Sequence, residues 1–254
     1  MNRYEQLKRK FDQRDKVTGT AVTFLNEPAL IEKMNREDLD FILFDMEHGR
    51  FDSQNLFPLL HICRVLGLPS IVRVQDSEYH LIAKTIDMGA DGVMIPRVEK
   101  LEQIKTAIDS ICFHPIGRKG VGGPLQFRKN ESFEQFQTGR FLIPQVESQK
   151  GMDILPEMLD EYGEKISGII VGPYDMSVML GTPLEVKSPV MMKAVQQTID
   201  ICASRKKSVG IFCSDTEEAG IFRSMGANLL WTMADTQFFM LGFTETFDDL
   251  SKIP

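Results

Sequence analysis

The amino-acid sequence predicts an α/β protein, a closed (β/α)₈ barrel formed by one domain over residues 1–254. Eight short runs rich in Val, Ile and Phe recur along the chain, and amphipathic segments with apolar residues spaced by three and four lie between most of them. Strands that are apolar along their length are typical of a parallel sheet buried on both faces. Eight strand–helix repeats therefore favour a barrel.

The expected strands follow one another in order. They are residues 17–24, 40–46, 70–74, 92–96, 141–146, 167–171, 208–213 and 228–232. Gly67, Gly89 and Gly226 stand between a helical segment and the next strand, where glycine commonly ends a helix. An open, doubly wound sheet is the alternative, but it rarely needs eight consecutive strands and usually begins with a glycine-rich turn that is absent here.

Two segments interrupt this regularity. Residues 115–130 (PIGRKGVGGPLQFRKN) form a long irregular stretch, and we expect it to lie over the barrel mouth because it follows the fourth strand. Residues 235–253 are helical in pattern and rich in Phe. This last segment is expected to cap the barrel or to pack on another subunit.

The composition bounds the kind of protein. With 43% hydrophobic and 26% charged residues, the chain can bury a large core. The net charge is -7 and no long basic run occurs, so neither nucleic acid nor an anionic membrane is an expected partner. Four cysteines without a CxxC pair, a charged N-terminus and no apolar run of membrane-spanning length indicate a soluble cytoplasmic enzyme.

Ionisable residues follow four of the expected strands. Asp45 and His48 end the second strand, Arg73 the third and Glu147 the fifth, and the sixth runs into Asp175. Barrel enzymes carry their chemistry at this end of the strands. Ion pairs that close the barrel are the alternative for any one residue, but four such strand ends together favour an active site.

Glu147 and Asp175 form a carboxylate pair on adjacent strands. Two carboxylates with open positions suit a hard divalent cation such as Mg²⁺ or Mn²⁺. A pair of hydrolase acids is the competing use, but it gives no role to Arg73 or His48. We therefore favour a metal site.

The remaining strand-end residues fit proton transfer and anion binding. Asp45 stands three residues before His48 and is expected to orient it as a general base. Arg73 suits an enolate or carboxylate oxygen. The turn from Gly172 through Tyr174 opens a short helix whose free backbone N–H groups suit a substrate carboxylate.

Two absences narrow the chemistry. No expected strand end carries a lysine, so a Schiff-base mechanism lacks an obvious nucleophile, although Lys119 and Lys150 stand in nearby loops. The turns after the seventh and eighth strands lack the glycine-rich pattern of barrel phosphate sites. A phosphorylated substrate is therefore disfavoured.

Several segments together resemble a known family. FDMEHGRFD, IVRV, GADGVMIPRVE, GRKGVGG, IPQVESQKG and GIIVGPYDMSVMLG resemble, in this order, the class II HpcH/HpaI aldolases. The resemblance implies reversible cleavage of a 4-hydroxy-2-oxoacid to pyruvate and an aldehyde, with a divalent cation (Mg²⁺, Mn²⁺ or Co²⁺), in a homo-oligomer that is usually a hexamer.

The resemblance also implies roles for individual residues. Glu147 and Asp175 would bind the metal, Arg73 the pyruvate carbonyl or enolate oxygen, and His48 paired with Asp45 would transfer protons. The amides of Tyr174 and Asp175 would hold the pyruvate carboxylate.

The chain departs from the family pattern around this core. Arg50 stands where an uncharged proline is usual, and we expect it either to bind a distal carboxylate of the aldehyde or to pair with Asp52 or Glu99. Arg118, in the stretch 115–130, is the next candidate for specificity. Tyr174, Arg97 and Lys119 also replace more usual residues.

Two other functions compete with the aldolase prediction. A citryl- or malyl-CoA lyase shares the barrel and the carboxylate pair, and the basic stretch 115–130 would then contact the CoA phosphates. A barrel that has lost catalysis and acts as a binding module is the other, but it predicts loss of the charged strand ends, all of which are present.

Overall fold

The computed structural model describes residues 1–253 and is a closed barrel of eight parallel strands, each hydrogen-bonded to its neighbours in sequence order. The predicted fold is thus confirmed. The strands are β1 (Val17–Val22), β2 (Phe41–Asp45), β3 (Ser70–Arg73), β4 (Gly92–Ile95), β5 (Phe141–Val146), β6 (Gly168–Val171), β7 (Ser208–Cys213) and β8 (Leu229–Ala234). β1 pairs with β8 and closes the ring.

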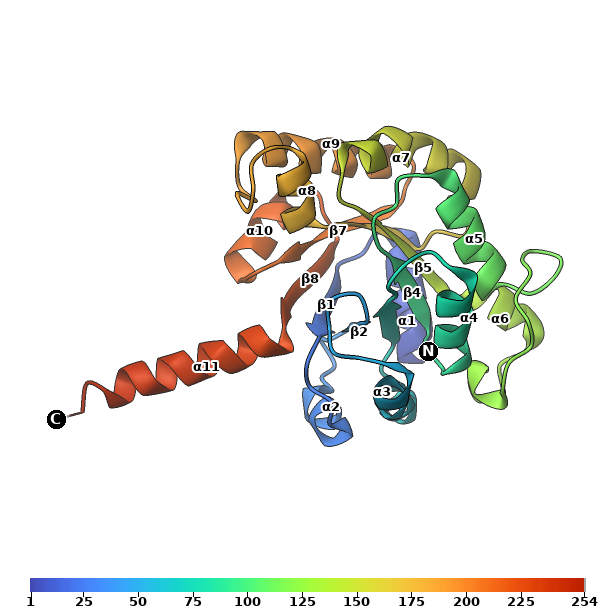
Figure 1. Cartoon of the computed structure of the whole chain (residues 1–254), viewed down its shortest axis with the longest axis horizontal. Coiled ribbons are helices and arrows are strands. Elements are labelled where there is room, and N and C mark those ends of the chain that lie inside the picture. The colour runs from blue at the N-terminus through green and yellow to red at the C-terminus, as the bar shows by residue number, and fades with distance from the viewer. Residues whose placement is uncertain (254) are drawn as a thin grey trace.

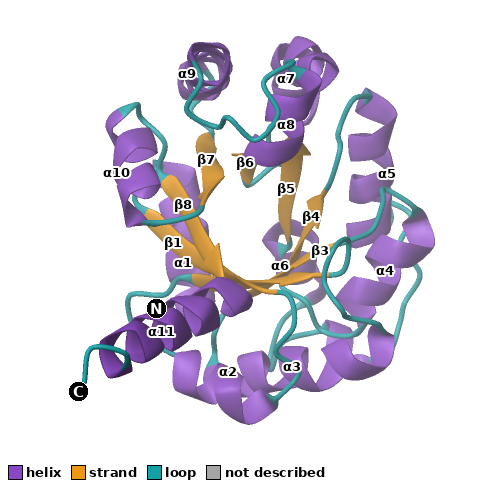
Figure 2. Cartoon of the chain, turned by 60° about the vertical axis from the view of Figure 1, so that its left-hand side comes forward, coloured by secondary structure: helices purple, strands orange, loops and turns teal. Residues whose placement is uncertain are grey.

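Helices surround the ring of strands (Figures 1 and 2). They are α1 (Arg3–Gln13), α2 (Pro28–Met34), α3 (Ser53–Leu66), α4 (Tyr79–Asp87), α5 (Leu101–Ile111), α6 (Phe133–Gly139), α7 (Gln149–Tyr162), α8 (Pro173–Met179), α9 (Pro189–Ser204), α10 (Thr216–Ser224) and α11 (Asp235–Leu250), with a 3₁₀ turn at Pro124–Gln126. Of the helices in residues 1–253, none is long and apolar enough to cross a membrane.

The alternation of side chains along each strand separates two buried layers. In β2, Phe41 and Leu43 lie in the barrel interior, whereas Ile42 and Phe44 pack outward against the helices. Leu7 and Phe11 of α1 join the interior cluster. Because the period is two, the next inward position of β2 after Leu43 is Asp45, at the end of the strand.

Glycines end helices where the sequence predicts. Gly67, Gly89 and Gly226 have φ of 65°, 107° and 110°, the left-handed region that glycine adopts without a steric cost. Gly67 caps α3 directly, and its N–H donates to the carbonyl oxygen of Arg64. The residue after each glycine then starts the short approach to the next strand.

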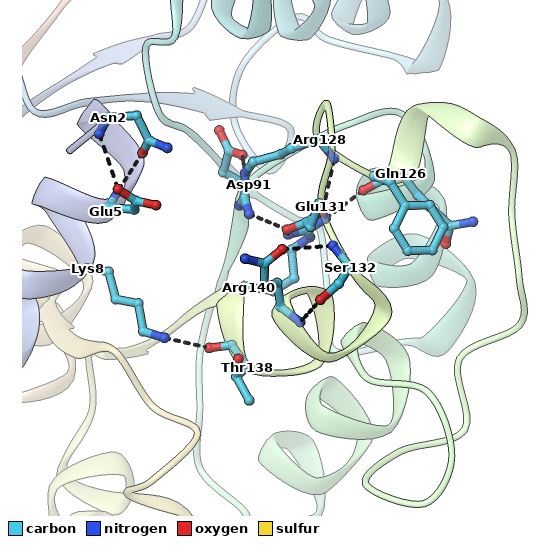
Figure 3. A network of polar contacts seen from close by, with 12 residues as sticks. Asn2, Glu5, Lys8, Asp91, Gln126, Arg128, Glu131, Ser132, Thr138 and Arg140 are labelled. Carbon is cyan, nitrogen blue, oxygen red and sulfur yellow. Dashed lines mark hydrogen bonds and ion pairs between the residues drawn. The ribbon is translucent and has the colours of Figure 1, made fainter.

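The stretch 115–130 does not cover the barrel mouth, and that prediction is wrong. It follows α5 rather than β4, so it leads from the end of a helix to the next strand, and such connections lie at the opposite end of the barrel. Arg128 Nε bonds Asp91 Oδ1 at 2.7 Å, and Asp91 directly precedes β4. Figure 3 shows Asp91, Arg128, Glu131 and Arg140 gathered in this network.

Helix α11 leaves the barrel after β8 and extends away from it (Figure 1). Asp235, its first residue, is the only buried residue of the helix. Its large apolar side chains are exposed, namely Phe238, Phe239, Met240, Leu241, Phe243, Phe247 and Leu250. The helix therefore does not cap the barrel.

Candidate active site

The inward positions at the carboxyl ends of the strands form the wall of one pocket. Asp45 of β2, Arg73 of β3 and Gln145 of β5 each follow an apolar inward residue two positions earlier, namely Leu43, Ile71 and Ile143. Phe212 of β7 and Trp231 of β8 complete the wall opposite them. The pocket encloses about 170 Å³. That is below the roughly 300–1,000 Å³ of pockets for drug-sized ligands, so it fits a small substrate.

Arg73 and Asp45 form a two-point ion pair. Arg73 Nε donates to Asp45 Oδ1 at 2.8 Å and Nη2 to Oδ2 at 2.6 Å. Burial lowers the pKa of Arg73, but the hydrogen bonds and charge of Asp45 outweigh it, so this pKa rises. The fork fixes the guanidinium at the pocket wall.

Asp45 also shapes the turn after β2. Its Oδ1 accepts the backbone N–H groups of Glu47 at 3.0 Å and His48 at 3.3 Å. The carboxylate thus reaches the backbone of His48, while its two oxygens bind Arg73. The expected contact between Asp45 and the imidazole ring of His48 is not observed.

The imidazole of His48 lies beside Glu47 instead. Its Nε2 is 3.8 Å from Glu47 Oε2, and its side chain is 66% exposed at the mouth. His48 still lines the pocket, together with Arg73 and Asp175. An exposed imidazole at this position can exchange protons with both a bound substrate and water.

Glu47 contacts two arginines of the site, a role that the sequence pattern did not indicate. Its carboxylate lies 3.3 Å from Arg73 Nη1 and 3.3 Å from Arg97 Nε. Burial raises the pKa of Glu47, against the lowering effect of Arg73, His48 and Arg97. Glu47 follows Asp45 by two residues. In an extended chain this spacing places both side chains on the same side, which here faces the barrel interior.

Glu147 is held by two donors just above β5. Its Oε1 accepts the N–H of Arg97 and its Oε2 accepts Gln145 Nε2, both at 2.7 Å. Burial raises the pKa of Glu147 to about 7; the bond from Arg97 lowers it, while the charge of Asp175 raises it further. Arg97 has a φ of 48°, an unusual conformation for a non-glycine residue, and it aims this N–H at Glu147.

Gly172 makes room for that carboxylate. A Cβ atom at this position would lie 2.3 Å from Glu147 Oε2 and 2.5 Å from Gln145 Nε2. Gly172 also precedes α8, so Asp175 falls in the first turn of that helix, at the pocket wall. The structure thus brings together Glu147, Asp175, Arg73, His48 and the start of α8.

Neither predicted specificity arginine lines the pocket. The guanidinium carbon of Arg50 lies 4.6 Å from the centroid of the exposed Phe24 ring, on the loop after β1. Arg50 is therefore beside the mouth, but it is not among the ion-pair partners of Asp52 or Glu99. The backbone N–H of Arg118 donates to Asp109 of α5 at 2.8 Å, outside the pocket.

No lysine among residues 1–253 lines the pocket. Lys119 is buried against Asp87 of α4, and its ammonium lies 5.5 Å from the centroid of Phe113. Lys150 is 77% exposed and pairs with Glu99 at 3.8 Å. Both positions are outside the pocket wall, which agrees with a mechanism that uses no Schiff base.

Gln145, Phe212 and Trp231 are wall residues that the sequence pattern did not indicate as part of a site. Gln145 is a polar residue at an inward position of an otherwise apolar strand, and that contrast is a usable signal. Phe212 and Trp231 contribute aromatic rings, whose centroids are 4.9 Å apart. Their apolar character made them look like ordinary core residues.

Comparisons with known proteins show the family of this chain. A sequence model of the HpcH/HpaI aldolase/citrate lyase family matches residues 22–240. The 2-keto-3-deoxy-L-rhamnonate aldolase of Escherichia coli (strain K12) is 27% identical over 205 residues, 79% of this chain and 76% of that protein.

Two solved structures share the fold. The HpcH/HpaI aldolase from Desulfitobacterium hafniense DCB-2 superposes with a TM-score of 0.89 at 22% identity, covering 98% of this chain and 97% of that one. A protein of the HpcH/HpaI aldolase/citrate lyase family from Burkholderia cenocepacia J2315 gives 0.88 at 24% identity, covering 97% and 99%. Because the family model matches residues 22–240, most of the chain, this chain belongs to the HpcH/HpaI aldolase/citrate lyase family.

Proposed function

We propose that this chain is a divalent-metal-dependent class II aldolase that reversibly cleaves a 4-hydroxy-2-oxoacid to pyruvate and an aldehyde. One observation carries the proposal. The buried Glu147, whose pKa is raised to about 7, shares the barrel mouth with Asp175, Arg73 and His48. The similarity to the 2-keto-3-deoxy-L-rhamnonate aldolase of Escherichia coli supports the same substrate class.

The residues present fit a hard cation. Burial raises the pKa of Glu147 and the charge of Asp175 raises it further, and a divalent cation held by both carboxylates would favour the charged form of Glu147. Among residues 1–253, no group of three or more His, Cys, Asp or Glu side chains is arranged to hold a metal. A two-carboxylate site leaves positions for substrate and water oxygens, as Mg²⁺, Mn²⁺ or Co²⁺ requires.

The protein side chains account for the remaining parts of the reaction. When bound, the cation would polarise the oxygens of the 2-oxoacid. Arg73 faces the C2 oxygen, where negative charge develops as the C3–C4 bond breaks and its electron pair forms the enolate. The amides of Tyr174 and Asp175, at the start of α8, hold the carboxylate.

His48 carries the proton transfers in this proposal. It removes the proton of the 4-hydroxyl group, directly or through water, so that the aldehyde carbonyl forms while the enolate leaves. Protonation of the enolate at C3 then gives pyruvate. The exposed ring at the mouth supports this role, since the 4-hydroxyl end of the substrate must point away from the carboxylate end at α8.

The position of residues 115–130 does not support the competing CoA-lyase function. That function assigned the basic stretch 115–130 to CoA phosphates, but its Arg128 bonds Asp91 at the far end of the barrel. A binding module without catalysis is also disfavoured, because the charged strand ends converge on one pocket.

The assembly is part of the proposal. Helix α11 exposes the Phe, Met and Leu side chains of residues 238–250 and packs only at its first turn. An apolar surface of this kind on a water-soluble chain suits a protein interface. We therefore include a homo-oligomer, with a hexamer as the expected state, in which α11 contacts a neighbouring copy.

A panel of substrates tests the activity. The protein with Mg²⁺ or Mn²⁺ should release pyruvate from at least one short 4-hydroxy-2-oxoacid and should not cleave citryl- or malyl-CoA. Release of acetyl-CoA from either thioester, with no pyruvate from any oxoacid, would replace the aldolase by the CoA lyase.

A further inference from the structure

The pocket wall has two halves of opposite character. The residues on β2, β3, β5 and the turn after β6 are polar or charged, and Asp45, Arg73 and Asp175 belong to this half. The half contributed by β7, β8 and β1 consists of Phe212, Trp231, Ala234, Ala21 and Thr23. Because β7, β8 and β1 are consecutive in the closed sheet, these residues form one continuous surface.

Aromatic rings dominate this second half. Phe212 packs edge-on against Trp231 with ring centroids 4.9 Å apart, and Tyr174 lies 6.0 Å from Phe212. Trp231 is 4% exposed, so its ring is a fixed part of the barrel interior. Ala21 and Ala234 are small side chains that line the same half of the pocket.

This half offers no charge to a substrate carboxylate. The neighbouring carboxylate of Asp235 already has hydrogen-bond donors from the protein. Its oxygens accept the N–H groups of Phe24 at 2.8 Å and Leu25 at 2.7 Å, and the hydroxyl of Thr23 at 2.6 Å. Arg73 lies 5.9 Å from the Trp231 ring centroid, but in the proposed reaction its guanidinium faces the C2 oxygen of pyruvate, in the polar half. The buried Trp231 Nε1 has no hydrogen-bond partner among residues 1–253, so a carboxylate here would gain at most one neutral donor and no counter-charge for its lost hydration.

The arginine that was expected to bind a distal carboxylate of the aldehyde does not line this half of the pocket. The guanidinium carbon of Arg50 lies 4.6 Å from the centroid of the Phe24 ring, outside the pocket.

We propose that the aldehyde end of the site takes an uncharged acceptor whose apolar body packs against Phe212 and Trp231. The inference rests on the proposed aldolase function and names its substrate class. Pyruvate occupies the polar half, and the aldehyde carbonyl faces His48 while its side chain lies on the aromatic half. Phe212 and Trp231 are then specificity-determining residues, and Arg50 is not.

A matched pair of aldehydes tests this directly. 4-Methylpentanal and succinic semialdehyde have the same chain length and branching and differ in an isopropyl group against a carboxylate. With Mg²⁺ and pyruvate, kcat/KM for aldol addition should be roughly 10-fold or more higher for 4-methylpentanal, the discrimination that an apolar pocket supplies. Phe212→Leu should keep most of this ratio, and Phe212→Lys should shift it toward succinic semialdehyde.

Two control variants separate the determinants. Phe57→Asn alters an exposed aromatic residue of α3 outside the pocket, and Arg50→Ala removes the arginine beside the mouth; both should keep the wild-type ratio. A wild-type preference for succinic semialdehyde, or a ratio that Phe212→Lys leaves unchanged, would overturn the inference.

The two proposals fail in different ways. Exchange of the pyruvate methyl protons needs no aldehyde, so it reports the proposed function alone. Exchange combined with a preference for the carboxylated aldehyde refutes only the acceptor inference. Absence of both exchange and addition refutes the proposed function and the inference with it.

Discussion

At the scale of single residues, Glu47 connects the charges of the barrel mouth. Its carboxylate lies between the guanidinium groups of Arg73 and Arg97 and beside the imidazole of His48. Asp45 accepts a hydrogen bond from the guanidinium of Arg73 and another from a backbone N–H of the turn after β2. The base and the cationic group of the proposed reaction thus share one buried carboxylate, which fixes their separation.

His48→Ala is expected to lower kcat for cleavage of a 4-hydroxy-2-oxoacid by roughly 10²–10⁴, the usual contribution of a general base. Steady-state release of pyruvate measures this. His80, an exposed histidine of α4, provides the matched control, since His80→Ala should keep the wild-type rate. Equal rates for the wild type and His48→Ala would assign proton transfer to another group.

The sequence predicted ionisable residues at or shortly after the ends of four strands. Asp45 and Arg73 end β2 and β3, Glu147 directly follows β5, and Asp175 lies in the first turn of α8 after β6. Asp45, Arg73 and Asp175 line the pocket, and Glu147 bonds Gln145 of its wall. The partner of the His48 ring was not predictable, because its distance to Glu47 depends on how the turn after β2 folds. Phe212 and Trp231 were not predicted as site residues, because an inward aromatic residue has the same sequence pattern whether it fills a core or lines a pocket.

At the scale of elements, the connection between α5 and β5 stabilises the closed end of the barrel. Glu131 accepts hydrogen bonds from Arg140 Nη1 at 2.7 Å and from the backbone N–H of Arg128 at 2.9 Å (Figure 3). Arg128 also bonds Asp91, directly before β4. These bonds tie the connection to the starts of two strands, which supports a structural role at this end.

Glu131→Gln should lower the free energy of unfolding by about 3–5 kcal/mol, because it leaves the buried Arg140 without a counter-charge, whereas Arg128 keeps Asp91. Burial raises the pKa of Glu131, but its bonds to Arg140 and Arg128 outweigh this, so the pKa is lowered. A carboxyl with a lowered folded-state pKa stabilises the protein above its unfolded-state pKa, and the effect disappears as the pH falls through the folded-state value.

Denaturant unfolding at several pH values measures this difference. The difference in free energy of unfolding between the wild type and Glu131→Gln should have its full value at neutral pH and should decrease in acid. Glu134→Gln, at an exposed position of α6, is the matched control. If the two proteins had the same free energy of unfolding at neutral pH, or if their difference stayed constant down to strongly acidic pH, the structural role would be contradicted.

The order of the elements was more predictable than the position of one connection. Apolar strand runs and helical spacing are local signals, and they gave all eight strands. The face on which residues 115–130 lie depends instead on whether a helix precedes them, and α5 had to be located first. Once α5 is placed, the rule for barrel connections puts this stretch at the closed end.

At the scale of the whole molecule, the exposed surface of α11 is the main feature that one chain leaves unexplained. The rings of Phe243 and Phe247 lie 4.5 Å apart along it, and both are about half exposed. Such a surface is stabilised when another apolar surface covers it.

The protein should therefore be an oligomer at micromolar concentration by light scattering. Replacing Phe243 and Phe247 together with Asp should dissociate it, because each Asp places an unpaired charge in the contact. Lys252→Asp, near the same end of the chain, serves as a charge control and should leave the mass unchanged. A monomeric wild type would refute the proposed assembly.

The exchange of pyruvate methyl protons with D₂O, followed by proton NMR, tests the central proposal most directly. It requires only the enolisation that the carboxylate pair, Arg73 and a base are proposed to support. With Mg²⁺ the wild type should catalyse exchange, EDTA should abolish it, added Mg²⁺ should restore it, and Glu147→Gln should lack it. Exchange that continues in EDTA and in Glu147→Gln, with inactivation by borohydride and pyruvate, would contradict the account.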